Sequence, residues 1–204
     1  LESARVVCAA ARELRASGRE LAFVDFGGGF GIDYGGAPVE PPPAFVRAAL
    51  GLLAEQGLAD LALAIEPGRS LVAPFGVLVA SVVQGKTSGS RRWCMIDAGM
   101  NDLLRPALYG ARHRIEPIEH APSSPEWQVV GPVCESADDF GLHALGPDLP
   151  QAVALRDAGA YGFTMASEYN GRALPAEVFV AGGRVAHVSR SPGVEAWVER
   201  RLGA

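Results

Sequence analysis

The sequence contains very little lysine. Of its 18 basic residues, Lys86 is the one lysine and the other 17 are arginines. Any chemistry that needs a reactive lysine must therefore use Lys86 or a segment outside these 204 residues. Cysteine is scarce too, with three residues, Cys8, Cys94 and Cys134. They lie far apart and form no Cys-x-x-Cys pair and no Cys/His cluster at zinc-ligand spacing. These absences argue against a disulfide framework and a metal site, and they favour a reducing compartment.

Long hydrophobic runs and an excess of positive charge are also missing. No apolar run approaches the roughly 18 residues of a membrane span. The first 18 residues carry five charged side chains and lack the apolar centre of a signal peptide. The net charge of −5 offers no broad attraction for nucleic acid or for an anionic membrane. We therefore expect a soluble, cytoplasmic protein.

The order of the predicted elements indicates two parts. In the first part, two short apolar runs, 21–26 and 61–65, are typical of strands buried on both faces. Each follows an amphipathic helix, one with Val6, Val7, Ala10 and Leu14 on one face and one with Phe45, Ala49, Leu52 and Leu53 on one face. From about Phe75 onwards strand-like runs dominate, at 76–83, 93–96, 127–130, 152–155, 176–181 and 184–189, before a terminal helix at 193–202. The fold class is therefore α/β for residues 1–74, followed by a mainly β domain for 75–204.

Glycines follow the first predicted strand. The segment Gly27–Gly31 reads GGGFG and does not fit the GxGxxG pattern, because Ile32 stands where its third glycine belongs. Such a cluster can bring backbone N–H groups close to an anion, or it can simply form a sharp turn. Both interpretations stay open on this segment alone.

A carboxylate and a guanidinium follow the second predicted strand. Glu66 and Arg69 belong to the segment EPGR, which should lie on the same rim of the sheet as the glycine cluster. The pair could be a surface ion pair. Alternatively, Arg69 could bind a phosphate or carboxylate while Glu66 holds a protonated heterocyclic nitrogen.

Three further segments of the second part contain candidate functional residues or a candidate motif. Arg105 and Tyr109 stand beside a proline-anchored turn after the motif DAGMND, and Cys134 and Glu135 follow a predicted strand in GPVCES. A buried, inert thiol is the common fate of cysteine, so Cys134 alone indicates little. Residues 80–87 satisfy the loose phosphate-loop pattern, but no helix follows them, and a hairpin turn is the favoured interpretation.

Taken together and in this order, the motifs GGGFGI, EPGRSLV, DAGMNDLLRPALY, GPVCES and DAGAYGFTMASEYN resemble the C-terminal half of the diaminopimelate decarboxylase family. These enzymes use pyridoxal phosphate and share the fold of alanine racemase and ornithine decarboxylase. The resemblance covers residues 21–175. It implies the last units of a (β/α)₈ barrel, a β-rich C-terminal domain, and a homodimer with active sites at the interface.

The resemblance also implies roles for particular residues. The expected cofactor-binding residues are Gly27, Gly28, Gly29 and Gly31 on the phosphate, Glu66 on the pyridine nitrogen, and Pro67, Gly68, Arg69 and Tyr161. The expected substrate-binding residues are Arg69, Arg105, Tyr109, Glu135 and Tyr161. Cys134 is the expected proton donor, and it would enter the active site from the partner subunit together with Glu135. A carboxylate such as Glu66 favours the protonated ring nitrogen, which physically suits its role.

The sequence departs from the family in several places. The cofactor-linking lysine and the ring-stacking histidine have no matching motif, and Lys86 lies in the wrong context to replace the lysine. Glu168, residues 171–177 and Ala137 also differ from the usual form. We therefore expect a C-terminal fragment that is inactive alone. The alternatives are a decarboxylase of the ornithine, arginine or carboxynorspermidine type, one from a secondary-metabolite pathway, and a non-catalytic regulatory homologue.

Overall fold

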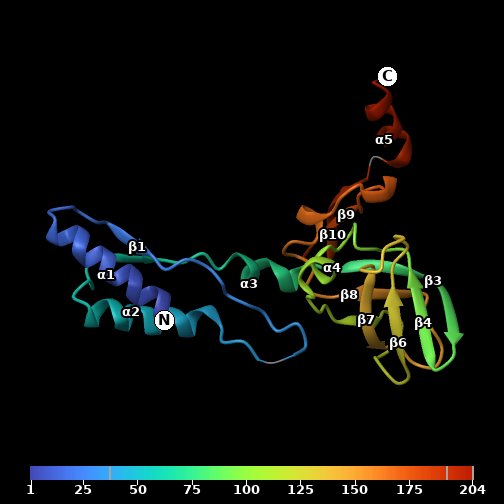
Figure 1. The fold of residues 1–204 in the computed structure, drawn as a ribbon, viewed down its shortest axis with the longest axis horizontal. Coiled ribbons are helices and arrows are strands. Elements are labelled where there is room, and N and C mark those ends of the chain that lie inside the picture. Colours follow the sequence, from blue (N-terminus) through green and yellow to red (C-terminus); the bar gives the residue numbers. More distant parts are fainter. Residues whose placement is uncertain (37, 192, 204) are drawn as a thin grey trace. The chain divides into compact units, whose positions relative to one another are not determined.

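The computed structural model describes residues 1–36, 38–191 and 193–203. The chain divides into two compact units, Leu1–Val72 and Ala73–Ala204, whose elements are labelled in Figure 1. Within the described ranges, no helix combines the length and the apolar character needed to cross a membrane.

The first unit alternates helices and strands as the sequence predicts. In chain order it contains α1 (Glu2–Ala16), β1 (Phe23–Asp25), α2 (Pro42–Glu55), β2 (Ala62–Ala64) and the short α3 (Gly68–Val72). The strands β1 and β2 pair in parallel, with Val24 opposite Leu63. A complete (β/α)₈ barrel needs eight such strands, and the described part of this unit supplies two.

The core of the first unit lies where the two helices meet β1. It is built from Ala4, Cys8 and Ala11 of α1, Ala49, Leu52 and Leu53 of α2, and Val24, Phe26, Leu58 and Leu61. The predicted inner face of α2 is thus confirmed, except that Phe45 is only half-buried. The predicted inner face of α1 is wrong except at Val7, which is half-buried against the core, because Val6 is 68% exposed and Leu14 is 46% exposed. The small residues Ala4, Cys8 and Ala11 allow closer packing and form the buried face instead.

The expectation that the first strand is buried on both faces is also wrong for this chain. Val24 is buried, whereas its neighbour Phe23 is 59% exposed. Successive side chains of a strand point to opposite faces of a sheet. Both helices pack on the Val24 side, and no described segment of this unit covers the Phe23 side.

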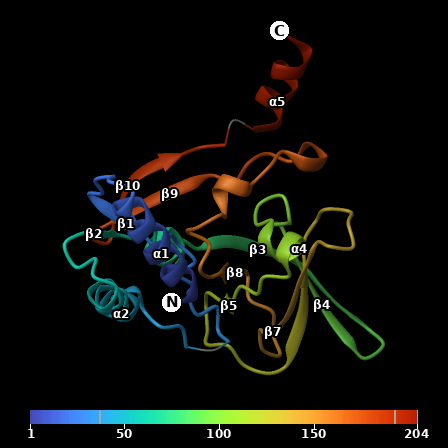
Figure 2. The same ribbon diagram turned by 60° about the vertical axis from the view of Figure 1, so that its left-hand side comes forward.

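The second unit is built on a six-stranded mixed sheet, seen from two directions in Figures 1 and 2. Its strands are β3 (Leu78–Ser88), β4 (Arg91–Ile96), β5 (Ile115–Pro117), β6 (Glu126–Val130), β7 (Asp139–Ala144) and β8 (Ala152–Leu155). Their order is β5-β8-β3-β4-β6-β7, and all pairs are antiparallel except β4 with β6. The backbone N–H of Ile115 on β5 donates to Nδ1 of His143 on β7 at 3.3 Å, so the two edge strands meet and the sheet is nearly closed.

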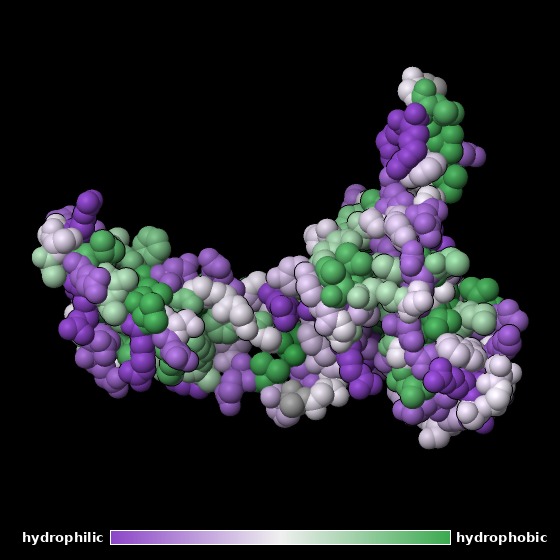
Figure 3. All heavy atoms as spheres, in the orientation of Figure 1, coloured by the Kyte–Doolittle hydropathy of each residue, from purple (hydrophilic) through white to green (hydrophobic). Residues whose placement is uncertain are grey.

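Shorter elements surround this sheet. They are three 3₁₀ turns, η1 (Ala73–Phe75), η2 (Phe163–Met165) and η3 (Tyr169–Gly171), the helix α4 (Arg105–Tyr109), the hairpin of β9 (Glu177–Ala181) and β10 (Arg184–Ser189), and α5 (Gly193–Leu202). The predicted hairpin at Gly182 and Gly183 and the predicted terminal helix are confirmed. The terminal helix carries hydrophobic residues along one side and hydrophilic residues along the other, as Figure 3 shows.

The sheet encloses the core of the second unit. Its fully buried side chains include Cys94, Ile96, Leu103, Val129, Leu145, Val153 and Leu155. Trp127 packs beside them, and its indole N–H donates to the carbonyl oxygen of Gly146 at 2.8 Å. A buried indole N–H is costly without such an acceptor, so this bond fixes the orientation of the ring.

Three sequence expectations for this unit need correction. Residues 80–87 form no turn, because they lie within β3, where Lys86 pairs with Trp93, and the turn comes later at Gly89. The strands β5 and β7 were not predicted, since one is three residues long and the other contains Gly141 in a left-handed conformation. The turn expected around Arg105 and Tyr109 is the single-turn helix α4.

Candidate functional site

Two loop tips lie side by side in the first unit. Beyond the ends of β1 and β2, the N–H of Phe26 donates to the carbonyl oxygen of Ala64 at 3.1 Å. The N–H of Glu66 then donates to the carbonyl oxygen of Gly27 at 2.9 Å. The parallel pairing therefore continues into the loops, and the prediction that the glycine cluster and Glu66 share one rim is confirmed.

Glycine is required in this cluster for two different reasons. Gly27 and Gly29 have φ angles of +74° and +90°, which side chains rarely adopt. At Gly28 the limit is space, because a Cβ atom there would lie 2.8 Å from the carbonyl oxygen of Glu66. The N–H of Gly27 donates to Oδ1 of Asp25 at 2.8 Å, so this glycine shapes the loop with both of its polar groups.

The two tips offer the chemistry that a pyridine phosphate needs. Apart from Gly29 and its two chain neighbours, no described residue has an atom within 4 Å of the place that a Cβ of Gly29 would take, so an anion can approach this backbone. On the adjacent tip the Glu66 carboxylate is exposed, and Arg69 follows it in α3. A cradle free of side chains, an acid and a guanidinium on one rim fit pyridoxal phosphate. Among the described residues, no cluster of His, Cys, Asp or Glu could hold a metal ion.

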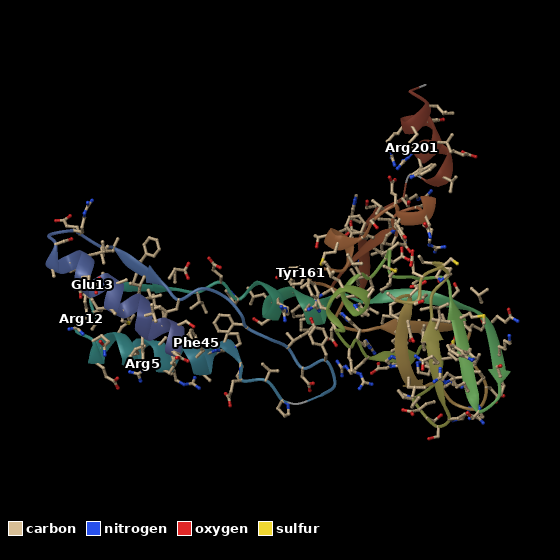
Figure 4. All side chains as sticks on the ribbon, in the orientation of Figure 1. Arg5, Arg12, Glu13, Phe45, Tyr161 and Arg201 are labelled. Atoms are coloured by element: carbon tan, nitrogen blue, oxygen red, sulfur yellow. The ribbon has the colours of Figure 1, made fainter. Side chains whose placement is uncertain are left out.

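In the second unit, Arg105 and Tyr161 come together. Arg105 begins α4 and is 7% exposed, and its Cζ atom lies 5.6 Å from the centroid of the Tyr161 ring. Tyr161, labelled in Figure 4, has a φ angle of +62°. A tyrosine in this conformation is uncommon and indicates a side chain whose direction is fixed by its surroundings. Tyr109, one helical turn after Arg105, is 66% exposed.

Cys134 and Glu135 stand on an exposed turn after β6. The turn is closed by two hydrogen bonds, from the Glu135 N–H to the Val133 carbonyl at 2.8 Å and from the Asp138 N–H to the Glu135 carbonyl at 3.1 Å. Of the three thiols, Cys134 alone is exposed. Burial raises the pKa of the Cys94 thiol to about 11, which keeps it protonated and inert.

Asp138, which sequence reasoning missed, holds this turn in place. Its buried carboxylate accepts hydrogen bonds from the N–H groups of Val133 and Met100, both at 2.6 Å. A Cβ atom at Gly131 would lie 2.4 Å from the same carboxylate, so this glycine is needed for the close approach. Burial raises the pKa of Asp138, and the two backbone donors oppose that rise. Asp138 therefore ties the turn of Cys134 to the loop that contains Met100.

Asn101, a second buried polar residue that sequence reasoning missed, holds the segment after Tyr161 in place. The Arg172 guanidinium donates to Oδ1 of Asn101 at 3.1 Å and to the carbonyl oxygen of Asp97 at 2.6 Å. The N–H of Ser167 donates to the Asn101 carbonyl oxygen at 2.8 Å. Asn101 lies inside the motif DAGMND, but sequence alone does not show that such a polar residue is buried. A buried polar residue needs partners that only the fold supplies.

Comparison with known proteins gives a matching family model and similar decarboxylases. Residues 17–162 match the family model described as pyridoxal-dependent decarboxylase, C-terminal sheet domain. The chain is 39% identical to the diaminopimelate decarboxylase of Zymomonas mobilis over 186 residues, covering 89% of this chain and 44% of that protein. It is 42% identical to the diaminopimelate decarboxylase of Archaeoglobus fulgidus over 180 residues, covering 84% of this chain and 42% of that protein. The chain thus spans about half the length of the curated relatives it matches.

Solved structures agree with these matches. The crystal structure of diaminopimelate decarboxylase from Helicobacter pylori, complexed with L-lysine, aligns at a TM-score of 0.83 with 37% identity, over 99% of this chain and 50% of that one. A lysine/ornithine decarboxylase from Vibrio vulnificus, complexed with cadaverine, aligns at a TM-score of 0.69 with 28% identity, over 83% of this chain and 47% of that one. The chain carries the C-terminal sheet domain of this fold and belongs to the pyridoxal-dependent decarboxylases.

Proposed function

We propose that this chain is the C-terminal half of an enzyme that uses pyridoxal 5'-phosphate to decarboxylate meso-2,6-diaminoheptanedioate to L-lysine. The observation that carries the proposal is the pairing of the two loop tips in the first unit, where the Glu66 N–H binds the Gly27 carbonyl at 2.9 Å. The relatives at 39% and 42% identity are diaminopimelate decarboxylases, and they support this choice of substrate.

The first unit would supply part of the cofactor site. When bound, the pyridine ring of the cofactor accepts the electron pair that the departing CO₂ leaves behind. The backbone of Gly28, Gly29 and Gly31 would receive the phosphate, because Gly27 already uses its N–H on Asp25. The Glu66 carboxylate would keep the pyridine nitrogen protonated, since an adjacent negative charge favours the cationic form. Arg69, after Pro67 and Gly68, would bind the phosphate or the substrate carboxylate.

The second unit would supply the substrate contacts and an acid. Arg105 and Tyr161 would bind the substrate together, with the guanidinium on a carboxylate and the tyrosine ring beside it. Tyr109 would reach the substrate from its exposed place one turn along α4. Glu135 would bind the ammonium group at the far end of the substrate. Cys134 would deliver a proton to Cα, a role that needs an accessible thiol.

We further propose that the enzyme is a homodimer in the cytoplasm. Its barrel would be completed by an N-terminal half like those of the relatives, which would also supply the cofactor-linking lysine. Residues 1–74 would form the last βα units of that barrel. The uncovered side of β1, where Phe23 is 59% exposed, supports this, because an exposed aromatic strand face needs a partner. In the dimer, Cys134 and Glu135 would serve the partner's active site.

A basic amino acid decarboxylase of the ornithine type is the rival within the same chemistry. The lysine/ornithine decarboxylase noted above aligns less well than the diaminopimelate enzyme, at a TM-score of 0.69 against 0.83. A guanidinium at Arg105 and a carboxylate at Glu135 also favour a substrate whose far end carries both a carboxylate and an ammonium group.

The role of Cys134 gives a direct test in the complete enzyme. Replacing it, Cys134→Ala, should lower kcat by about 100-fold or more, as expected for loss of a general acid. Cofactor absorbance should be unchanged, because the thiol does not hold the cofactor. Cys8→Ala is the matched control, since Cys8 is buried in α1 far along the chain and should leave turnover intact. Unchanged turnover in Cys134→Ala would contradict the proposal.

A further inference from the structure

We propose that Tyr169 is a positioning residue that holds Glu135 ready for the far end of the substrate. The proposal rests on the proposed function, in which Glu135 binds the substrate ammonium group. The phenolic O–H of Tyr169 donates to Oε1 of Glu135 at 2.5 Å. The two residues are 34 positions apart, so the fold and not the local sequence creates this contact.

The contact restricts the side chain of Glu135 through one of its two oxygens. Hydrogen bonding to the carboxylate raises the pKa of the Tyr169 phenol, so the tyrosine stays a donor. Glu135 is exposed, and an exposed glutamate samples many rotamers that must be given up on binding. One oxygen bound by Tyr169 removes part of that cost in advance and leaves the second oxygen for the ligand.

The backbone of Tyr169 is itself held firmly. Asn170 has φ +55° and Gly171 has φ +71°, so the chain makes a tight left-handed turn directly after the tyrosine. Before the turn, the Ser167 N–H binds the Asn101 carbonyl, and after it Arg172 binds the Asn101 side chain. The tyrosine therefore projects from a turn anchored on both sides.

The terminal helix adds a third anchor. Arg200 and Arg201 of α5 both pair with the carboxylate of Glu168, the residue before Tyr169. The Arg201 guanidinium, labelled in Figure 4, also lies 3.8 Å from the centroid of the Trp197 ring. The Trp197 ring in turn lies 3.6 Å from the place that a Cβ of Gly171 would take. Helix α5 thus packs against the turn that presents Tyr169 and is joined to it through Glu168.

A double-mutant cycle in the complete, cofactor-loaded enzyme tests the proposal. Tyr169→Phe keeps the ring and removes only the donor. We expect KM for diaminopimelate to rise about tenfold, as for a lost hydrogen bond to a charged group, with kcat changed less than about threefold. Calorimetry should show a similar loss of affinity for L-lysine, and the midpoint of thermal unfolding should stay within about 2 °C of wild type.

The Glu135→Gln variant and the double variant distinguish a failure of this inference from a failure of the proposed function. Glu135→Gln should raise KM more than Tyr169→Phe, and the double variant should be no worse than Glu135→Gln alone. The positioning role would be overturned if the effects of the two substitutions on KM multiplied in the double variant. It would also be overturned by an unchanged KM in Tyr169→Phe, or by a fall in kcat as large as the rise in KM. A normal KM in Glu135→Gln would instead overturn the assignment of Glu135, and the proposal with it.

Discussion

At the scale of single residues, two glycines are needed because another group lies against them. Gly28 faces the carbonyl oxygen of Glu66, and Gly131 faces the carboxylate of Asp138. In each case a Cβ atom would come within 3 Å of an oxygen, although these glycines need no left-handed φ angle. Both glycines adjoin residues expected to enter the active site. Their role is to allow close approach, which a glycine pattern in the sequence cannot distinguish from flexibility.

Gly28 allows a matched pair of substitutions. Gly28→Ala should weaken cofactor affinity and lower stability by about 1–3 kcal/mol, because the new methyl group presses on a backbone oxygen that cannot rotate away. Gly51→Ala, in the exposed interior of α2, should instead stabilise by up to about 1 kcal/mol through helix propensity. Thermal unfolding and cofactor titration of both variants in the complete enzyme measure these effects. Equal behaviour of the two would contradict the close packing of the two loop tips.

Residue roles were the least predictable part of the site. The sequence placed the glycine cluster and Glu66 on one rim because parallel strands end at the same edge, and the structure confirms this. It did not identify Asp138 or Tyr169, although both lie in or beside motifs already noted. Their roles depend on contacts made across 34 to 38 residues, and periodicity carries no information about such pairs.

At the scale of elements, the turn that carries Cys134 depends on one buried carboxylate. Asp138 accepts two backbone N–H bonds of 2.6 Å, one within the turn and one from the loop of Met100. Buried donors that lose their acceptor cost about 1–3 kcal/mol each. The turn has no regular secondary structure to stabilise it otherwise.

Asp138→Ala should therefore lower the free energy of unfolding by about 2–4 kcal/mol, since the buried N–H of Val133 and the half-buried N–H of Met100 both lose their acceptor. It should also reduce turnover, because Cys134 would lose its fixed position. Ser136→Ala, an exposed change in the same turn, serves as the control and should cost less than about 0.5 kcal/mol. Urea unfolding of the two variants checks the prediction, and equal stability would contradict the anchoring role.

His143 links the two edge strands and predicts a pH dependence. Its Nδ1 accepts from the Ile115 N–H, and its Nε2 lies 2.9 Å from the Phe140 carbonyl oxygen, so the neutral ring fits both partners. Burial lowers the pKa of His143 below its ordinary value of 6.5, and burial likewise lowers the pKa of His113. The unfolded chain therefore binds protons more readily than the folded chain as the pH falls.

The stability that His143 contributes is complete above pH 6.5 and is lost as the pH falls through the lowered pKa. The slope cannot exceed about 1.4 kcal/mol per pH unit for one histidine. In His143→Gln the free energy of unfolding should change less steeply between pH 6.5 and 5 than in wild type. His120→Gln, at an exposed histidine, is the control variant for the substitution itself. Identical slopes in wild type and His143→Gln would show that the ring does not titrate as the fold predicts.

Elements with strong periodicity were predictable, and short ones were not. The helices α1, α2 and α5 and the hairpin of β9 and β10 match their predicted positions within a few residues. The strand β5 is only three residues long and is specified by pairing with β8, which no local pattern reveals. For α1 the sequence predicted a helix but the wrong buried face, because Ala4, Cys8 and Ala11 are less hydrophobic than Val6 and Leu14.

At the scale of the whole molecule, the two units contribute different chemistry. The first holds the glycine cradle and Glu66 within one parallel pair of strands. The second presents Arg105 from helix α4, and Cys134 and Glu135 from a turn after β6, beside a nearly closed sheet. In the first unit, side chains on α1 and β1 such as Val6 and Phe23 are exposed, and hydrophobic periodicity alone did not indicate which faces would stay uncovered.

The formation of L-lysine tests the account most directly. The complete enzyme, loaded with pyridoxal phosphate, should release CO₂ and L-lysine from meso-2,6-diaminoheptanedioate, with kcat/KM at least about 100-fold higher than for ornithine or lysine. The proposed reason is that Arg105 and Glu135 would together bind a far end that bears both charges. Faster decarboxylation of ornithine or lysine, or no lysine from diaminopimelate in protein shown to hold its cofactor, would contradict it.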